Sequence, residues 1–588
     1  MKKQSVIRLF SLLSTGLIIG MIASSCIGVK EITSKIEQEN KNRPVTKPTP
    51  DHIPEPKPEV PNDNSGTQAL LNKARTELDA KLNSKETNVS AYNDYSVIKT
   101  ELEAAYNSAE MIKNNNEATV DQLEQAKNSL EQAIIKAQND KINFDSSHMG
   151  LVSAYNGLKT VLESKESNLS SLNDPKYAGL KSVLENKYAV ADGIITNTLQ
   201  ASDLTEEKID NANNEINNIT TDLRLKKDNV DEYWNAKKFP ISDSNFVGNF
   251  AKSATNTGNQ FSTAFNSNVS FTNNWKIAKK RIEHFTDAQN NAATDVAWIY
   301  DLTPNNSSVA TYDIIFDYYG GNSAVLYFPY KRRSTNDNLG LMYKLNNGVN
   351  IDITSHVSEA SINDIKVAEI HIEGLVFGRN KISLFTPESK NNPIIGSMYI
   401  SLPNSEDGKN KAIDSMFGNE RNDSNSNIIT VNFLKGYGLS NKTKMLITKK
   451  NGKLDNSANS DNYYLVGWLG GKEGNNSTES EKVRYYTFYI NALQDGNYKL
   501  RGIYNTTVNR ALLFSIDTFN NNQNKIKFIN LNSGNNGNNL KTFNESNKEG
   551  SSPDNLQLKK GLNKIIVSGD ENGSEGPNLG NVTFTLQR

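Results

Sequence analysis

The apolar positions between residues 68 and 139 recur with the period of an α-helix. Three such stripes follow one another, separated by Asn- and Ser-rich breaks. The stripes consist of Leu70, Ala74, Leu78 and Leu82, then Ile98, Leu102, Ala105, Tyr106 and Ala109, then Leu123, Ala126, Leu130 and Ala133. Apolar side chains at this spacing lie on one face of a helix. The pattern predicts a three-helix bundle over residues 67–140.

The same pattern returns further along the chain, which indicates a structural repeat. Tyr95, Lys99, Leu102, Tyr106 and Ala109 recur at an offset of 82 as Tyr177, Lys181, Leu184, Tyr188 and Ala191. A constant offset over many positions is typical of tandem modules, so we predict a second three-helix bundle over residues 141–235. Both bundles resemble the FIVAR-type helical modules of bacterial surface proteins, and we expect their tyrosines to lie in the core.

From about residue 236 the helical pattern gives way to short alternating or β-branched segments between clusters of Gly, Asn and Ser. Such segments predict antiparallel strands. This half repeats too, because Gly378, Asn380 and Ile382 recur at an offset of 183 as Gly561, Asn563 and Ile565. We therefore predict a multidomain protein, α then β, whose second half holds tandem β-sandwich modules of jelly-roll-like type. They cover residues 236–420, with a mixed N-terminal segment, and residues 421–588. The second resembles carbohydrate-binding modules of galactose-binding-like type.

The N-terminus has the pattern of a bacterial export signal. Basic residues precede an apolar run over residues 9–23, which is shorter than the roughly 20 residues of a membrane-spanning helix. The run ends in small residues before Cys26, the one cysteine of the chain. This arrangement resembles a lipobox, so we predict a signal peptide over residues 1–25 and acylation of Cys26. Acylated Cys26 would anchor the chain in membrane lipid on the extracellular face of the cell membrane. Recurrent prolines predict an extended tether over residues 26–66.

Composition argues against several classes of function. The net charge of −1, from 65 Lys+Arg and 66 Asp+Glu, argues against a nucleic-acid-binding protein. The single cysteine excludes a multi-cysteine metal site, and the five histidines have no ligand spacing. We expect no enzyme, no cofactor and no metal, although the sequence leaves a two-carboxylate glycosidase open. Asp570-Glu571-Asn572-Gly573 is predicted to form a polar turn rather than a calcium loop.

A sugar site requires aromatic rings for the CH faces of a pyranose and polar groups for its hydroxyls. An acidic sugar also favours a guanidinium, whose fork fits a carboxylate. The candidates are Tyr318 and Tyr319 before a Gly-Gly turn, Tyr330 beside Arg332 and Arg333, and Trp468 before a second Gly-Gly pair. Each has a structural alternative: a tyrosine that caps a strand, basic residues in a solvated loop, and a tryptophan in the sandwich core.

Several strings together resemble the variably expressed lipoprotein and haemagglutinin (VlhA, pMGA-type) family of mycoplasmas. Besides the signal and the tether, they are Thr-Asn-Val-Ser-Ala-Tyr-Asn-Asp-Tyr at 87–95, Phe-Asp-Ser-Ser-His at 144–148, and Asn-Leu-Gly-Asn-Val-Thr-Phe-Thr-Leu at 578–586. The resemblance implies an antigenically variable surface adhesin or haemagglutinin that binds host-cell glycoproteins, sialylated ones included. Only Cys26 carries over as a site. The alternatives are a non-adhesive variable coat for immune evasion and, third, a glycosidase or protease.

Overall fold

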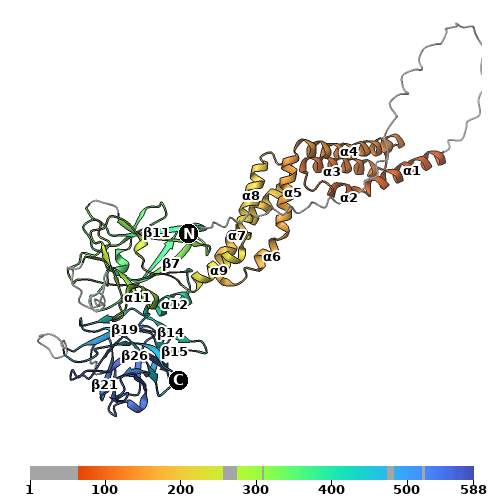
Figure 1. The fold of residues 1–588 in the computed structure, drawn as a ribbon. Helices are drawn as coiled ribbons and strands as arrows, with labels where there is room; N and C mark the ends of the chain where they lie inside the picture. Colours follow the sequence, from red (N-terminus) through yellow and green to blue (C-terminus); the bar gives the residue numbers. More distant parts are fainter. Residues whose placement is uncertain (1–63, 256–273, 307–309, 473–482, 520–522, 588) are drawn as a thin grey trace, which may run out of the picture. The chain divides into compact units, whose positions relative to one another are not determined.

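The computed structural model describes residues 64–255, 274–306, 310–472, 483–519 and 523–587 (Figure 1). The chain divides into two compact units, Met1–Leu70 and Leu71–Arg588, and the fold given below is that of the second unit. The predicted signal peptide, Cys26 and nearly all of the predicted tether lie outside the described residues. Within the described ranges, no helix has both the length and the apolar character that crossing a membrane requires.

The first predicted bundle is confirmed as helical. Its helices are α1 (Asn64–Leu82), α2 (Lys85–Ser90), α3 (Ser96–Asn114) and α4 (Val120–Ser147). The stripes supply its fully buried side chains, among them Leu78, Leu102, Tyr106, Leu123 and Leu130, whereas Leu70 is exposed. Thr119 begins α4 with a capping box, in which its hydroxyl accepts a hydrogen bond from the Gln122 amide. Because α4 continues to Ser147, the predicted boundary at residue 140 falls inside this helix.

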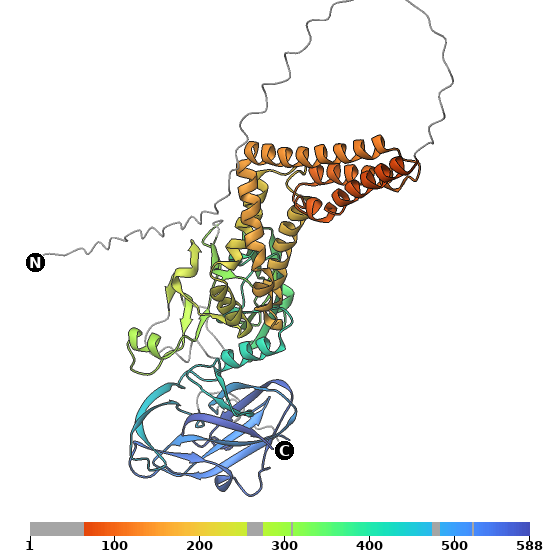
Figure 2. The same cartoon turned by 90° about the vertical axis from the view of Figure 1, so that its right-hand side faces the viewer.

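The second bundle repeats the packing of the first. Its helices are α5 (Met149–Glu163), α6 (Lys165–Ser170), α7 (Ala178–Asn197), α8 (Glu206–Thr220) and α9 (Leu223–Trp234). Figures 1 and 2 show α3 alongside α4, and α5 alongside α8. The Asn88 amide donates to the Tyr106 hydroxyl at 2.7 Å, and the Asn168 amide donates to the Tyr188 hydroxyl at 2.9 Å. Both rings are fully buried, so the prediction of core tyrosines is confirmed.

The first β module consists of two sheets. Its strands are β1 (Lys237–Phe239), β2 (Phe246–Gly248), β3 (Ala254–Thr255), β4 (Trp275–Lys279), β5 (Ala297–Ile299), β6 (Ala310–Tyr318), β7 (Ser323–Lys331), β8 (Met342–Leu345), β9 (Asn350–Asp352), β10 (Lys366–Glu373), β11 (Gly378–Phe385), β12 (Ile394–Ile395) and β13 (Met398–Ser401), with helix α11 (Asp287–Ala293) before β5. One sheet has the order β1-β13-β7-β12-β5-β4-β3, with β10 also paired to β7, and the other has the order β2-β6-β11-β8-β9.

The second β module follows helix α12 (Glu406–Phe417) and also has two sheets. Its strands are β14 (Asn419–Asn422), β15 (Asn425–Val431), β16 (Leu439–Ser440), β17 (Ile447–Leu454), β18 (Asp461–Val466), β19 (Tyr485–Ala492), β20 (Gly496–Asn505), β21 (Arg510–Ile516), β22 (Lys525–Leu531), β23 (Asn539–Phe543), β24 (Leu556–Leu558), β25 (Gly561–Ser568) and β26 (Asn578–Leu586). One sheet has the order β14-β15-β26-β18-β17-β23-β20-β24, and the other has the order β16-β19-β25-β21-β22.

The strand orders confirm the repeat that the sequence predicts. In the five-stranded sheets, β2-β6-β11-β8-β9 and β16-β19-β25-β21-β22 correspond strand by strand along the chain. The repeated asparagine makes equivalent contacts in both modules. The Asn380 amide donates to the carbonyls of Val376 and Gly378, and the Asn563 amide donates to those of Lys559 and Gly561. The repeated Gly-x-Asn sequence therefore fixes the turn before β11 and β25.

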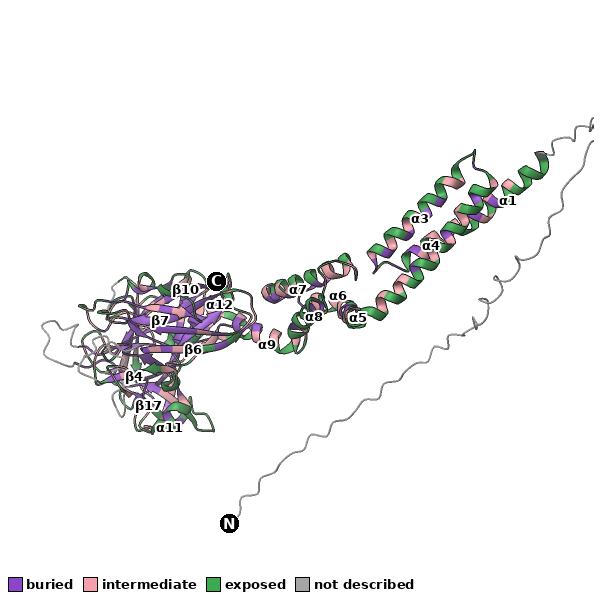
Figure 3. Ribbon diagram, turned by 90° about the horizontal axis from the view of Figure 1, so that it is seen from above, coloured by how far each residue is buried: buried purple, intermediate pink, exposed green. Residues whose placement is uncertain are grey.

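The two β modules share a buried interface. The Tyr437 hydroxyl of the second module donates to the Ala297 carbonyl of the first at 2.6 Å, and the ring centroids of Tyr437 and Trp298 are 4.5 Å apart. The fully buried Lys280 ammonium donates to the carbonyls of Phe433, at 2.6 Å, and Gly436. Figure 3 shows that buried residues dominate the β strands, whereas the helices carry mostly exposed and intermediate ones.

Candidate functional site

Trp468 is the candidate aromatic residue that the structure leaves open to solvent. It lies two residues after β18, its side chain is part of the surface, and the residue is 41% exposed. Its φ of 63° places the backbone in the left-handed region, which a bulky residue adopts only when its surroundings hold it there. Held backbone strain of this kind often marks a functional position. We call residues 467–472 the Trp468 loop.

Basic side chains surround the Trp468 ring. The Lys444 ammonium lies 4.1 Å from the ring centroid, and the Arg484 guanidinium carbon lies 6.0 Å from it. Lys444 is exposed, whereas the Arg484 side chain is only 4% exposed. The Lys444 ammonium lies over one face of the indole, and the exposed part of the ring offers an apolar surface to a sugar next to a positive charge for a carboxylate.

The loop between β25 and β26 contacts the Trp468 loop through the backbone. The Gly576 amide donates to the Leu469 carbonyl at 2.7 Å, and Gly470 forms a β-bridge with Glu575. Two carboxylates of the same loop pair with lysines of β22: Asp570 with Lys527 at 2.9 Å, and Glu571 with Lys525 at 2.8 Å. The carboxylates of the predicted polar turn thus contact lysines. The described residues hold no cluster of three or more His, Cys, Asp or Glu side chains suited to a metal ion.

Tyr318 and Tyr319 lie where α9 meets the first β module. Tyr318 is fully buried, its hydroxyl donates to the Ser323 carbonyl at 2.6 Å, and its ring packs edge-on against Tyr233 of α9. Burial also raises the pKa of Tyr318. Tyr319 is half-buried, with its ring centroid 4.8 Å from that of Phe377. The contact of Tyr318 with Tyr233 packs α9 against the first β module, and Tyr318 presents no ring face to solvent.

Tyr330, Arg332 and Arg333 lie at the end of β7 and just beyond it. Tyr330 is 3% exposed, and burial raises its pKa to about 12. Arg333 is buried and pairs with the buried Asp301 at 2.7 Å. Arg332 is half-buried and donates to the Thr335 carbonyl at 3.3 Å. Arg333 is therefore inside the module and Arg332 is half-buried, so the two arginines do not form a solvated loop.

Several residues of the Trp468 site were not singled out from the sequence: Lys444, Arg484, Arg510 and Glu575. They come from four separate stretches of the chain, and only the packing of two sheets brings them together. The feature of the sequence that points to this site is the Gly470-Gly471 pair. Both glycines have left-handed φ values, of 65° and 66°, which indicates a tightly constrained loop.

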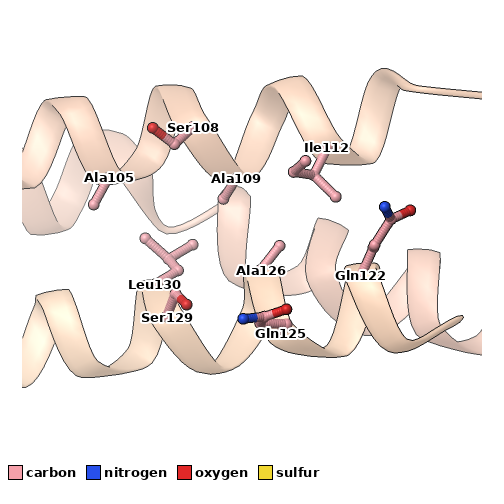
Figure 4. Close-up of a pocket in the computed structure, with 9 residues that line it drawn as sticks. All are labelled: Ala105, Ser108, Ala109, Ile112, Gln122, Gln125, Ala126, Ser129 and Leu130. Atoms are coloured by element: carbon pink, nitrogen blue, oxygen red, sulfur yellow. The ribbon is translucent and has the colours of Figure 1, made fainter. Parts of the chain in front are cut away.

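The structure also contains a groove between α3 and α4, with a cavity volume of about 290 Å³ (Figure 4). Its walls are small or uncharged side chains, among them Ala105, Ser108, Gln125, Ala126 and Ser129. A similar groove, of about 480 Å³, lies between α7 and α8 at the equivalent place of the second bundle. Neither groove is lined by an aromatic ring, so neither meets the requirements of a sugar site.

The architecture is that of a protein with tandem helical modules and tandem sandwich modules. The FIVAR domain model matches residues 74–138 and 154–224, which are the two bundles. The model of the Mycoplasma haemagglutinin family matches residues 221–361 and 352–587, more than half of the chain. The chain belongs to the Mycoplasma haemagglutinin family.

Solved structures with partial similarity include carbohydrate-binding modules. A family 35 module from Clostridium thermocellum is 20% identical, covering 21% of this chain and 78% of its own, with a TM-score of 0.15. A module from Cellvibrio mixtus lichenase 5A, in complex with cellotriose, is 9% identical, covering 24% and 88%, with a TM-score of 0.16. The two-sheet architecture of the modules follows from their own strand order. No curated protein matches the chain.

Proposed function

We propose that the chain is a surface haemagglutinin whose second β module binds host-cell glycans at Trp468. The observation that carries this proposal is the exposed indole held in a left-handed backbone conformation with the Lys444 ammonium 4.1 Å from its ring. Family membership supports the choice of a cell-surface glycan as ligand. Sialylated glycoproteins suit the site because their carboxylate would be attracted to Lys444.

The candidate residues of the first β module are not part of the proposed binding surface. Tyr318, Tyr330 and Arg333 are buried, and Tyr319 and Arg332 are half-buried. A ring that stacks on a sugar has to expose its face, and a guanidinium that binds a carboxylate has to reach it. We therefore assign the binding surface to Trp468 and Lys444 rather than to the end of β7.

Binding at one such site is expected to be weak, and display of many copies would strengthen it. An acylated Cys26 would hold many copies on one membrane, where the second and later contacts form at high effective concentration. The proposed arrangement is a lipid anchor, a tether over residues 26–66, helical spacers over 67–140 and 141–235, and β modules over 236–420 and 421–588. Antigenic variation would then act on the exposed loops of the β modules.

Agglutination tests this proposal directly. The purified full chain, coupled to beads at high density, is mixed with erythrocytes before and after sialidase treatment. The proposal predicts agglutination that falls after desialylation. Absence of agglutination at every density would contradict it and would favour a non-adhesive variable coat. Release of free sugar from the cells would favour a glycosidase instead.

The lipid anchor has its own test. Cells expressing the chain are fed radiolabelled palmitate, and the chain is compared with the Cys26→Ser variant. We expect label in the wild-type chain and none in the variant, because the thiol is the acceptor of the diacylglyceryl group. Equal labelling of both chains would exclude Cys26 as the attachment point.

A further inference from the structure

Arg484 contacts the Trp468 loop through both its backbone and its side chain. Its amide donates to the Gly471 carbonyl at 3.1 Å, and its carbonyl accepts from the Gly470 amide at 2.8 Å. Its Nε donates to the carbonyl of Trp468 itself at 2.8 Å. The left-handed Trp468 backbone is thus held at its carbonyl oxygen by a buried guanidinium.

The loop is shaped around that guanidinium. A Cβ placed on Gly471 would collide with Arg484 Nη2, and the φ of Gly471 is 66°. Only glycine combines this backbone conformation with the close approach of the guanidinium. The absence of a side chain at Gly471 therefore makes room for Arg484 under the loop.

A carboxylate fixes the far end of the guanidinium. Glu575 Oε1 lies 3.5 Å from Arg484 Nη2, and Glu575 Oε2 lies 2.9 Å from Arg510 Nη2. Arg510 also donates to the Gly576 carbonyl at 2.7 Å. Glu575 therefore bridges two arginines that lie at the starts of β19 and β21, and it fixes Arg484 in the orientation that its contact with Trp468 requires.

We infer that Arg484 is a positioning residue, which holds the Trp468 indole open toward ligand and does not itself contact the glycan. This inference rests on the proposed function for its ligand, but the geometry of the Trp468 loop stands apart from it. A lysine cannot replace Arg484, because a single ammonium cannot reach both the Trp468 carbonyl and Glu575 with the spread of a guanidinium.

Fluorine NMR of the full chain labelled with fluorotryptophan tests the inference. The chain has four tryptophans, and Trp468→Phe identifies the Trp468 resonance by its loss. In Arg484→Met and Arg484→Lys we expect a shift or broadening of that resonance alone, together with at least about a tenfold loss of agglutination titre. Arg501→Met, which removes an exposed arginine of β20, is the matched control and should leave both readouts unchanged.

The outcomes separate this inference from the proposed function. An unchanged Trp468 resonance in Arg484→Met would overturn the positioning role, even if Trp468→Ala abolished agglutination. A shifted Trp468 resonance with unchanged agglutination would support the positioning role and contradict glycan binding at Trp468. If Arg484→Met disturbs all four resonances, the experiment is repeated with Glu575→Gln. This variant weakens the ion pair with Arg484 and keeps the size of the side chain. A shift confined to Trp468 would then support the inference, and no shift would overturn it.

Discussion

The two β modules share a strand order but differ at the same loop. Strands β5 and β18 directly precede the matched strands β6 and β19. Two residues after β5 the first module has Asp301, and two residues after β18 the second has Trp468. Asp301 is buried and pairs with the buried Arg333, whereas Trp468 is exposed. The repeated framework thus supports a closed polar cluster in one module and an open aromatic site in the other.

Burial of the surrounding sheet differs in the same direction. Eight of the nine residues of β7, from Ala324 to Lys331, are buried, because helix α12 contacts this strand and residues of the second module pack nearby. In β18, which leads into the Trp468 loop, only the last two of six residues are buried, and Trp468 itself keeps an exposed side chain. Under the proposed function, the second module carries the binding surface and the first module joins the helical bundles to it.

The largest expected effect comes from the closed cluster. Asp301→Ala removes the carboxylate that Arg333 contacts in a buried pair with side-chain exposures of 3% and 8%, so we expect a loss of about 3–5 kcal/mol in the free energy of unfolding. Glu575→Ala breaks the pairs with Arg510 and Arg484, whose shared carboxylate is 45% exposed, and should cost less, about 1 kcal/mol. Urea denaturation of both variants measures the difference. Equal losses would contradict the distinction between the buried Asp301–Arg333 cluster of the first module and the exposed Trp468 site of the second.

An intermediate effect tests the shared framework. Asn380→Ala and Asn563→Ala each remove a buried amide that bonds the N–H and C=O of the residue four positions before it, at a cost of about 2–3 kcal/mol. Because the contacts are equivalent, the two losses should agree closely. Asn497→Ala, at an exposed position of β20, is the control and should change stability little. A large loss in one module and none in the other would contradict their equivalence.

Two buried lysines, of which Lys280 lies at the interface between the modules, should make stability depend on pH. Burial lowers the pKa of Lys280 from its usual 10.5 to about 7, and the same holds for Lys331. Between these values the unfolded chain binds more protons than the folded chain, so the free energy of unfolding rises with pH, by about 1.4 kcal/mol per unit for each lysine. Lys280→Met should remove one of these contributions.

Urea denaturation at pH 7, 8 and 9 measures that slope. The variant also loses the hydrogen bonds to the Phe433 and Gly436 carbonyls, so the change of stability with pH, rather than its absolute value, is compared. Lys564→Met is the matched control, because the Lys564 ammonium also donates to a backbone carbonyl, that of Asn363, but from an exposed position. It should leave the slope unchanged. An unchanged slope in Lys280→Met as well would show that the buried amine does not titrate in this range.

The repeats could be predicted from the sequence because they are local patterns at constant offsets. The constant offset alone matches Tyr106 with Tyr188, and Asn380 with Asn563. The burial of Tyr318 was also within reach: in β6 the alternate residues Tyr312, Ile314, Phe316 and Tyr318 all face the core. Strand alternation therefore predicts an inward Tyr318, whereas its position before a Gly-Gly turn, taken alone, favours an exposed ring.

The contacts that distinguish the Asp301–Arg333 cluster from the Trp468 site could not be predicted from the sequence. Arg333 is 32 residues from Asp301 in the chain, and Glu575 is 91 residues from Arg484, the difference between their numbers. Such pairs form only when sheet packing and loop conformation are known. The same limit applies to Lys280, whose burial depends on carbonyl groups more than 150 residues away.

The agglutination titre of Trp468→Ala tests the central claim most directly. The variant and the control Val508→Ala, which removes another exposed apolar side chain of the second module, are displayed as full chains on beads at equal density. The account predicts that Trp468→Ala lowers the titre by at least about tenfold while Val508→Ala retains it. A wild-type titre for Trp468→Ala, in a chain that unfolds at the wild-type urea concentration, would contradict the assignment of glycan binding to this site.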